Sequence, residues 1–314
     1  MNIIDQKIKP IDSFEHLELS SLKKGQELSS NLYVEHEEDF VPILKAGTVL
    51  SEALLTKLKM YDSLYTLKKG LTCSNLLATI EHHKDDIQKC MKLLYTINER
   101  FFDSFFNHAK NRLDLYCIEA IVNAISFLTK DNPNFLKSAV SCFINNDKVS
   151  NHTLHVTIYA IKFAHVLGYS KEKYLQLGVA SMLHDIGMKK LDDSLVGKST
   201  PLSVAELEKV HKHASYSIEY IKQNNIYDPY ILDAVAHHHE RYDGSGYPNN
   251  YRAAHISEFA SILAICDVFD ALTNIRPYRE SYTIFETLKM MLKDPEFKGK
   301  FNDKYLKLLI KALA

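Results

Sequence analysis

The sequence predicts a mainly α-helical protein that carries a small mixed α/β module at its N-terminus. The 314 residues include only ten glycines and eight prolines, fewer turn-forming residues than a turn-rich β protein uses. Hydrophobic residues make up 46% of the chain, enough to bury one large core or two modest ones. Long stretches also repeat apolar residues at helical spacing without a helix-breaking residue.

Residues 1–72 form the predicted accessory module. The segments QELSSNLYVE and FVPILKAGTVL alternate apolar and polar residues and are rich in β-forming types, as strands are. Ser51 is the expected N-cap of a short helix in SEALLTKLKMY, and SLYTLKKG predicts a closing strand that ends at Gly70. No side chains with catalytic chemistry cluster here, so we interpret the module as accessory.

Residues 73–146 form a predicted helical connector. The segment LLATIEHHKDDIQKCMKLLYTINERFFDSFFNHAK predicts one long amphipathic helix. A second helix is expected over Leu113–Leu128, and DNPNF at 131–135 separates it from a further short helix. Helices of this kind often connect domains or form dimers, so a homodimer is one expectation.

The charge balance limits the kinds of partner. Lysine and arginine (38) nearly equal aspartate and glutamate (39), so no broad basic surface for a large nucleic acid is expected. A local basic pocket for a small anionic ligand remains compatible with this balance.

The cysteines and the apolar runs predict a location. The five cysteines are scattered and never form a CxxC spacing, which predicts reduced, buried thiols in a cytoplasmic protein. The N-terminus has no apolar signal core, and no run approaches the ~18 to 20 apolar residues of a membrane helix, so no membrane insertion is expected.

Residues 147–314 form the third predicted part, which carries the chemistry. Ten of the fifteen histidines lie between His152 and His255. Eight of these ten occur in four segments, NHTLHV, ASMLHDIGMKK, HKHAS and HHHERYDGSGYP, and a fifth segment, LAICDVFDALTNIRPYR, adds carboxylates and arginines.

Two carboxylates point to metal binding. Asp185 follows an apolar helical run and Asp267 lies within another, and burying a carboxylate is costly unless it is paired or bound to a metal. Imidazole and carboxylate together suit iron, manganese, zinc or nickel. The adjacent pair His184–Asp185 projects about 100° apart on a helix, so it can serve two neighbouring metals. Four or more histidines with two aspartates exceed what one tetrahedral metal needs, which predicts a dinuclear centre.

Other histidines carry weaker signals. His155, His165, His211 and His255 each lack a carboxylate at ligand spacing, so we interpret them as surface histidines or as histidines satisfied in the core. Asp270 is interpreted as a hydrogen-bond partner of a ligand imidazole, with a helix cap as the alternative.

Taken together, these motifs resemble the HD-GYP domains, a subgroup of the HD superfamily of metal-dependent phosphohydrolases. The resemblance rests on HDIG at 184–187, HHERYDGSGYP at 238–248, CDVFDAL at 266–272 and RPYR at 276–279, and it covers about residues 147–310. It implies an all-helical HD-type domain with a dinuclear or trinuclear metal centre, often of iron. It also implies hydrolysis of cyclic di-GMP to pGpG or GMP by a metal-bridged hydroxide, and contacts of the GYP region with diguanylate cyclase (GGDEF) domains.

The resemblance also implies roles for particular residues. Carried over by position, the metal ligands are His152, His184, Asp185, His213, His238, His239 and Asp267. His237 falls outside the pattern. The implied catalytic residues are Asp185, Tyr247 of the GYP motif, and Arg276 and Arg279, which are expected to contact substrate phosphate.

The chain departs from the family pattern at Met188, where the motif HDIGK has a lysine that is expected to contact the scissile phosphate. Lys189 and Lys190 follow but are expected to point elsewhere. Slow turnover is therefore expected, and a catalytically weak or inactive module that binds cyclic di-GMP or a protein is the alternative. Hydrolysis of another nucleotide, such as a mixed cyclic dinucleotide, is a third hypothesis.

Two further departures concern the metals and the packing. Lys148 stands where trinuclear members have a glutamate, so two metals are expected and not three. Ala214 and Ser217 replace a proline and a glycine that the family prefers after His213, which we interpret as a mild change.

Overall fold

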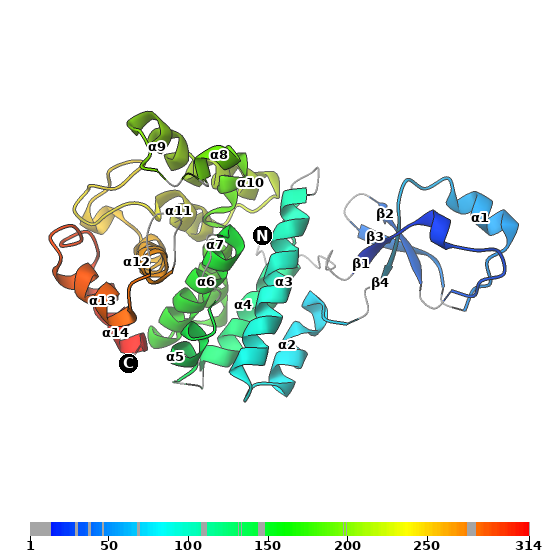
Figure 1. Ribbon diagram of the computed structural model, residues 1–314, viewed down its shortest axis with the longest axis horizontal. Coiled ribbons are helices and arrows are strands. Elements are labelled where there is room, and N and C mark those ends of the chain that lie inside the picture. The colour runs from blue at the N-terminus through cyan, green and yellow to red at the C-terminus, as the bar shows by residue number, and fades with distance from the viewer. Residues whose placement is uncertain are drawn as a thin grey trace.

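The structure is a computed structural model of the whole chain. It describes residues 14–28, 31–36, 39–45, 47–67, 70–107, 112–130, 132, 134–143, 148–196, 198, 200–274 and 281–313. A small β-rich module lies beside a larger helical body (Figure 1). The predicted fold class, mainly α with a small mixed module, is confirmed.

The N-terminal module is an antiparallel sheet in the order β1-β4-β2-β3, accompanied by the helix α1 and the 3-10 turn η3 (Leu19–Ser21). Its elements are β1 (Phe14–Leu17), β2 (Leu32–His36), β3 (Asp39–Leu44), α1 (Glu52–Leu58) and β4 (Leu64–Leu67). The predicted N-cap is confirmed, because the Ser51 hydroxyl accepts the N–H of Leu54. The module has an apolar cluster of its own, which includes Leu32, Leu50 and Leu64.

The helical body contains the remaining helices. They are α2 (Cys73–His82), α3 (Ile87–Asn107), α4 (Leu115–Lys130), α5 (Phe135–Val140), α6 (Val149–Val166), α7 (Lys171–Leu183), α8 (Asp193–Val196), α9 (Val204–His211), α10 (His213–Gln223), α11 (Pro229–His237), α12 (Glu258–Thr273), α13 (Ile284–Lys293) and α14 (Asp303–Leu313), with short 3-10 turns η4 (Ile186–Lys190) and η5 (Ala253–His255). No helix among the described residues is both long and apolar enough to cross a bilayer.

The long amphipathic helix predicted for the connector is two helices, so that prediction is wrong. The helix α2 ends at His82 and α3 begins at Ile87. The side chain of Asp86 accepts the N–H of Lys89 at 3.0 Å, and an aspartate that satisfies such an N–H starts a new helix. The polar run HKDD at 83–86 therefore separates two helices.

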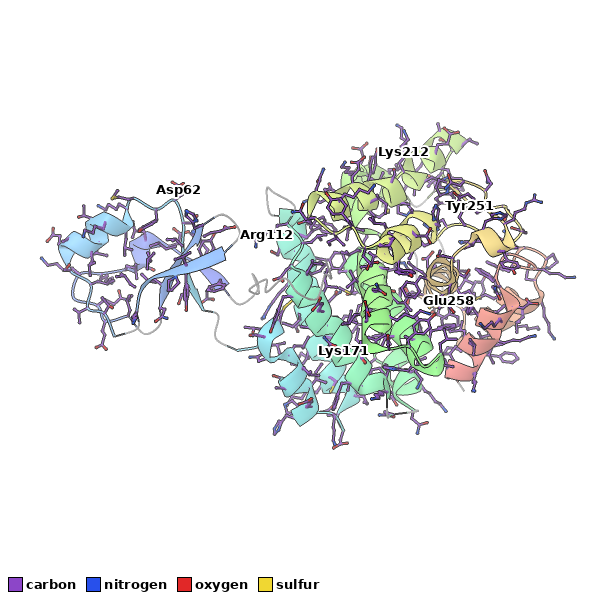
Figure 2. All side chains as sticks on the ribbon, turned by 180° about the vertical axis from the view of Figure 1, so that it is seen from behind. Asp62, Arg112, Lys171, Lys212, Tyr251 and Glu258 are labelled. Carbon is purple, nitrogen blue, oxygen red and sulfur yellow. A yellow bond between two sulfur atoms is a disulfide. The ribbon has the colours of Figure 1, made fainter. Side chains whose placement is uncertain are left out.

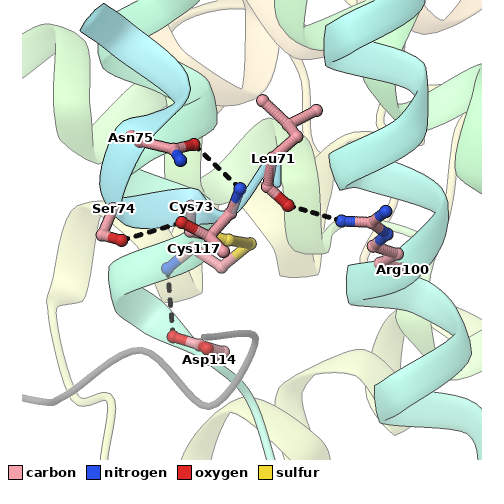
Figure 3. The surroundings of a disulfide bond; sticks show 8 residues. Leu71, Cys73, Ser74, Asn75, Arg100, Asp114 and Cys117 are labelled. Carbon is pink, nitrogen blue, oxygen red and sulfur yellow. Dashed lines mark hydrogen bonds between the residues drawn. A yellow bond between two sulfur atoms is a disulfide. The ribbon is translucent and has the colours of Figure 1, made fainter. Parts of the chain in front are cut away.

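The prediction that all five cysteines are reduced is also wrong. Cys73 and Cys117 form a disulfide that joins α2 to α4 across a sequence separation of 44, with Cα atoms 5.1 Å apart (Figure 3). Cys90, Cys142 and Cys266 are free. Pairing depends on Cα proximity in the folded chain, which the scattered sequence positions do not show.

One hydrophobic core runs through the whole helical body, from Cys73 in α2 to Leu309 in α14. The connector helices α2–α5 therefore share a core with the helices that carry the histidines. The predicted division at 146/147 stays a prediction. The central helices α6 and α12 are buried over most of their length, so polar residues on them face the interior.

A polar contact joins the module to the body. The Arg112 guanidinium lies 3.5 Å from the Glu35 carboxylate on β2, and both side chains are mostly shielded from solvent. Arg112 lies on the side of the body that faces the module (Figure 2).

Candidate metal centre

The predicted ligands come together in two groups of donor atoms. One group contains Asp185, His213, His238 and His239, and the other contains His152, His184 and Asp185. Within each group the donor atoms lie within 4.8 Å of one another. Asp185 belongs to both groups, so one carboxylate connects two sets of imidazoles.

Asp267 lies between the two groups. One of its oxygens is 3.1 Å from Nε2 of His152, and the other is 3.7 Å from Nδ1 of His239. All seven residues implied as ligands therefore surround a common space, and they are placed there by α6, α7, α10, α11 and α12.

The HDIG segment brings two helices unusually close. His184 ends α7, and the chain then turns through η4 against α10. A Cβ on Gly187 would lie 2.0 Å from the carbonyl oxygen of His213 and 2.5 Å from the backbone nitrogen of Ser217. Only glycine permits this close approach of the two segments. The approach places Oδ1 of Asp185 3.2 Å from Nε2 of His213.

Ser217, expected to be a mild change, stabilises the same turn. Its hydroxyl donates to the carbonyl of His184 at 2.7 Å and accepts the N–H of Gly187 at 2.9 Å. A glycine at this position would lack both hydrogen bonds.

The same kind of hydrogen bond orients the rings of three of the histidines. The Nδ1–H groups of His184, His213 and His238 donate to carbonyl oxygens three residues earlier, at 2.7, 2.7 and 2.8 Å. This hydrogen bond fixes the tautomer, because the other nitrogen, Nε2, is then left with a lone pair.

The Nε2 atom of His184 indicates that these residues fit a metal. It is buried and has no hydrogen-bond partner among the described residues, whereas buried polar atoms are normally satisfied. A nitrogen lone pair without a hydrogen-bond donor, surrounded by other imidazole and carboxylate groups, fits the coordination of a divalent metal.

The electrostatics of the site favour the protonation states that bind metals. Burial lowers the pKa of His238 to about 3, and burial lowers that of His239 as well, so both imidazoles are neutral near pH 7. Burial alone would raise the pKa of Asp185, but the surrounding histidines, His184 first, bring it down to about 2. Neutral imidazoles and ionised carboxylates are the forms that coordinate.

His152 is oriented differently. Its Nδ1 donates to Asp270 at 2.7 Å, as the interpretation of Asp270 as a partner of a ligand imidazole expected. His155 is buried and hydrogen-bonded to both Asp270 and Tyr95, so its interpretation as a histidine satisfied in the core is confirmed.

The three consecutive histidines do not act alike. His237 points away from both donor groups, with Nδ1 2.8 Å from Asp233 and Nε2 3.1 Å from the amide of Asn249. His238 and His239 both reach the centre.

The GYP turn is held by a buried carboxylate and a close backbone approach. Glu240 accepts the N–H groups of Asn249 and Tyr251 at 2.7 and 3.0 Å. Gly244 has a positive φ of 82°, whereas Gly246 is not among the positive-φ glycines. Gly246 is needed for space, because a Cβ there would lie 2.4 Å from the carbonyl oxygen of His239.

Tyr247 lies against the centre. Its ring stacks on that of His211, with centroids 3.6 Å apart, and on that of His239 at 4.7 Å. Burial, followed by the charges of Asp267 and Asp185, raises the pKa of Tyr247 above its usual value. The phenol therefore stays protonated close to the metal-site carboxylates.

The cations near the centre differ from the family pattern. Lys189 donates to the carbonyl of Phe105 at 2.9 Å, and Lys190 pairs with Glu219. As expected, neither of these ammonium groups, which follow Met188 in the chain, points toward the centre. Lys148 forms an ion pair with Glu99 at 2.8 Å. Arg276 and Arg279 lie outside the residues that the structure describes.

Arg241 is a cation that lies close to the centre. Its guanidinium donates to the carbonyls of His238 and Glu240 at 3.2 and 3.0 Å. Burial lowers its pKa, and the nearby charge of Asp267 opposes that shift.

Comparison with known proteins places the chain in a family. The family model described as HD domain matches residues 130–296, more than half of the chain. The chain therefore belongs to the HD domain family. Together with the relatives described next, this match confirms the predicted HD-GYP membership.

Several curated proteins are similar. The chain is 30% identical over 193 residues to the cyclic di-GMP phosphodiesterase PA4108 of Pseudomonas aeruginosa, covering 62% of this chain and 46% of that protein. It is 24% identical over 317 residues to a cyclic di-GMP phosphodiesterase of Thermotoga maritima, covering 91% and 82%. It is 34% identical over 133 residues to the 3'3'-cGAMP-specific phosphodiesterase 2 of Vibrio cholerae, covering 42% and 26%. The chain thus spans less than half the length of PA4108 and of the Vibrio protein.

A solved structure has the same fold. Bd1817, described as an HDG"Y"P protein from Bdellovibrio bacteriovorus, aligns with a TM-score of 0.60 at 19% identity, covering 96% of this chain and 99% of that one. The aligned region therefore includes both the N-terminal module and the helical body.

Proposed function

We propose that this chain is a metal-dependent phosphodiesterase that hydrolyses cyclic di-GMP to pGpG, GMP or both. The observation that carries the proposal is the pair of donor groups that share Asp185. Two metals held side by side suit an in-line displacement at a phosphodiester. Relatives named cyclic di-GMP phosphodiesterases support the choice of substrate.

Two divalent metals fit the two groups. His152, His184 and Asp185 would hold one, and Asp185, His213, His238 and His239 the other, with Asp267 between them. The set of nitrogen and oxygen donors suits iron, which we propose first, and also manganese, zinc and nickel. When bound, such metals supply a water with a pKa lowered toward neutrality and positive charge for the phosphate oxygens.

The chain's own residues would position the substrate. Asp185 stays ionised and connects the two groups, and the protonated hydroxyl of Tyr247 can donate to a phosphate or sugar oxygen at the rim. We propose Arg276 and Arg279 as phosphate contacts that stabilise the developing negative charge.

A second candidate function follows from Met188. With Lys189 and Lys190 turned to other partners, no neighbour from that turn replaces the missing lysine. The second candidate is a module that binds cyclic di-GMP, or a protein partner, with little turnover.

Base specificity is a separate question, because several relatives are named 3'3'-cGAMP-specific phosphodiesterases. Both cyclic dinucleotides therefore belong in the assay. A cytoplasmic location, a homodimer and a contact of the GYP turn with GGDEF domains stay predictions.

The test is elemental analysis of anaerobically purified protein, with hydrolysis assayed on the same sample. The proposal expects about two metals per chain, iron first, and release of pGpG or GMP from cyclic di-GMP. Full metal loading and tight dinucleotide binding without product would favour the binding module. Faster cleavage of 3'3'-cGAMP than of cyclic di-GMP would contradict the proposed substrate but support the proposed phosphodiester hydrolysis.

A further inference from the structure

A chain of buried hydrogen bonds continues beyond the metal ligands into the connector. Tyr95 on α3 contacts Nε2 of His155 on α6 through its hydroxyl. Nδ1 of His155 lies 3.1 Å from one oxygen of Asp270 on α12, and the other oxygen of Asp270 lies 2.7 Å from Nδ1 of His152. Three helices that are distant in sequence thus meet behind one ligand.

Chemistry fixes the direction of these hydrogen bonds. An ionised carboxylate only accepts, so both Nδ1 atoms that face Asp270 carry hydrogens. With neutral imidazoles, Nε2 of His155 accepts from the Tyr95 hydroxyl, and Nε2 of His152 keeps its lone pair for a metal.

The network is rigid and closed to solvent. The exposed fractions of Tyr95, His155 and Asp270 are 7%, 1% and 1%. The ring of His155 stacks on Phe143, with centroids 3.8 Å apart and an angle of 6°. The amide of Asn274 also donates to Asp270 at 2.6 Å, so the carboxylate has three donors and little freedom to rotate.

His152 is supported by different means from the other oriented ligand histidines. His184, His213 and His238 are oriented by backbone carbonyls three residues earlier in the chain. His152 depends on a side chain, Asp270, and Asp270 depends on His155 and Asn274. Loss of the network therefore acts on the group that contains His152 and spares His213, His238 and His239.

We propose that Tyr95 and His155 are positioning residues that set the affinity of the metal held by His152, His184 and Asp185. Partners of this kind typically change metal affinity 10- to 100-fold. Tyr95 lies upstream of residues 130–296 that match the HD domain, so the connector contributes to the metal centre. The inference rests on the proposed two-metal function.

The test is titration of metal-free protein with Mn²⁺, followed by electron paramagnetic resonance. Two neighbouring Mn²⁺ ions give a coupled spectrum, and a single bound ion gives an isolated six-line spectrum. Tyr95→Phe, which removes one hydroxyl, is expected to weaken one Mn²⁺ about 10-fold and leave the other within twofold. At intermediate Mn²⁺ the variant then shows the six-line spectrum where the natural protein shows coupling. His155→Leu is expected to weaken the same ion further.

Tyr159→Phe is the matched control. Tyr159 is buried in the same core on α6 and makes none of the hydrogen bonds that join Tyr95, His155 and Asp270, so both affinities should stay unchanged. Unchanged Mn²⁺ binding in Tyr95→Phe, or equal weakening of both ions, would overturn the inference. Binding is measured without substrate, so a protein that binds two Mn²⁺ ions as described but hydrolyses nothing would contradict only the proposed function.

Discussion

Met188 is the residue at which this chain departs most clearly from the motif that it otherwise retains. The neighbouring lysines cannot substitute, because Lys189 contacts the carbonyl of Phe105 and Lys190 contacts Glu219. Met188→Lys is therefore expected to raise the rate of cyclic di-GMP hydrolysis on the order of 10² to 10³-fold, the typical value of one such donor. Steady-state kinetics on metal-loaded protein measure the change.

The reverse change one residue later is its control. Lys189→Met removes a cation that points away from the centre, so the rate per folded molecule should stay the same. If Met188→Lys leaves the rate unchanged, another cation already serves the scissile phosphate, and the proposed role of position 188 is contradicted.

The sequence located the residues around the centre because they lie in short motifs with fixed spacing. It also predicted Asp270 as a hydrogen-bond partner of a ligand imidazole, but it missed Tyr95 and the role of His155 behind that carboxylate. Tyr95 reaches the site from α3, and no local pattern connects it with Asp270, 175 positions later. His155 stands three residues after His152 on the same helix face, which is a signal that could have been used.

At the scale of elements, the GYP turn depends on a glycine for space. A Cβ on Gly246 would lie 2.4 Å from both the backbone nitrogen of Arg241 and the carbonyl oxygen of His239. Because backbone atoms cannot yield as a side chain can, Gly246→Ala should cost about 1 to 3 kcal/mol of stability and displace His239. Urea unfolding of metal-free protein and a metal titration measure both effects.

Gly178→Ala is the control for crowding alone. Its Cβ would lie 2.5 Å from the side chain of Val122, in the core. It should lower stability without changing the metal affinity of the folded protein. Normal metal affinity in Gly246→Ala would contradict the role given to this turn.

The end of α11 carries a pH-dependent contact. The hydrogen bond between His237 and Asp233 raises the pKa of His237 above 6.5. The contribution of this pair to the stability of the fold is therefore present below pH 6.5 and is lost as the pH rises through the raised pKa. The same bond lowers the pKa of Asp233 below 3.8, so the contribution is also lost in strong acid.

His237→Gln should therefore destabilise metal-free protein more at pH 5.5 than at pH 8.5, by about 0.5 kcal/mol for a partly exposed pair. Urea unfolding at the two pH values measures the difference. His255→Gln, at an exposed histidine, should show no such dependence. An equal cost of His237→Gln at both pH values would contradict the contact.

Amphipathic spacing predicted the helices of the connector but not their ends. The apolar positions of α2 and α3 follow one another in sequence, and the helices are separated by a turn at which the Asp86 side chain accepts the N–H of Lys89. Capping of this kind depends on which conformation the tertiary contacts select, so periodicity alone could not place the break.

At the scale of the whole molecule, the disulfide joins α2 and α4 beside the start of the helical body. In the chain-entropy view, a loop of this length stabilises the folded state by about 4 kcal/mol. Cys117→Ser should therefore lower the free energy of unfolding by about that amount, while Cys142→Ser, at a free cysteine, should have little effect. Urea unfolding, with mass spectrometry of alkylated protein, tests the change; free thiols at both positions would contradict the pairing.

One shared core links the connector helices to the helices that carry the histidines. Helices α2–α5 pack in the same cluster as α6, α7 and α12, and Tyr95 of α3 reaches the hydrogen bonds behind a metal ligand. Sequence composition shows where the histidines lie but not which distant helices enclose them.

The central claim is that two donor groups joined by Asp185 hold two metals. Anomalous X-ray scattering from crystals grown with Mn²⁺ tests it directly, using data collected at the manganese absorption edge. Two peaks about 3.5 to 4 Å apart are expected, one on each side of the Asp185 carboxylate. A single peak, or two peaks that do not share Asp185, would contradict it.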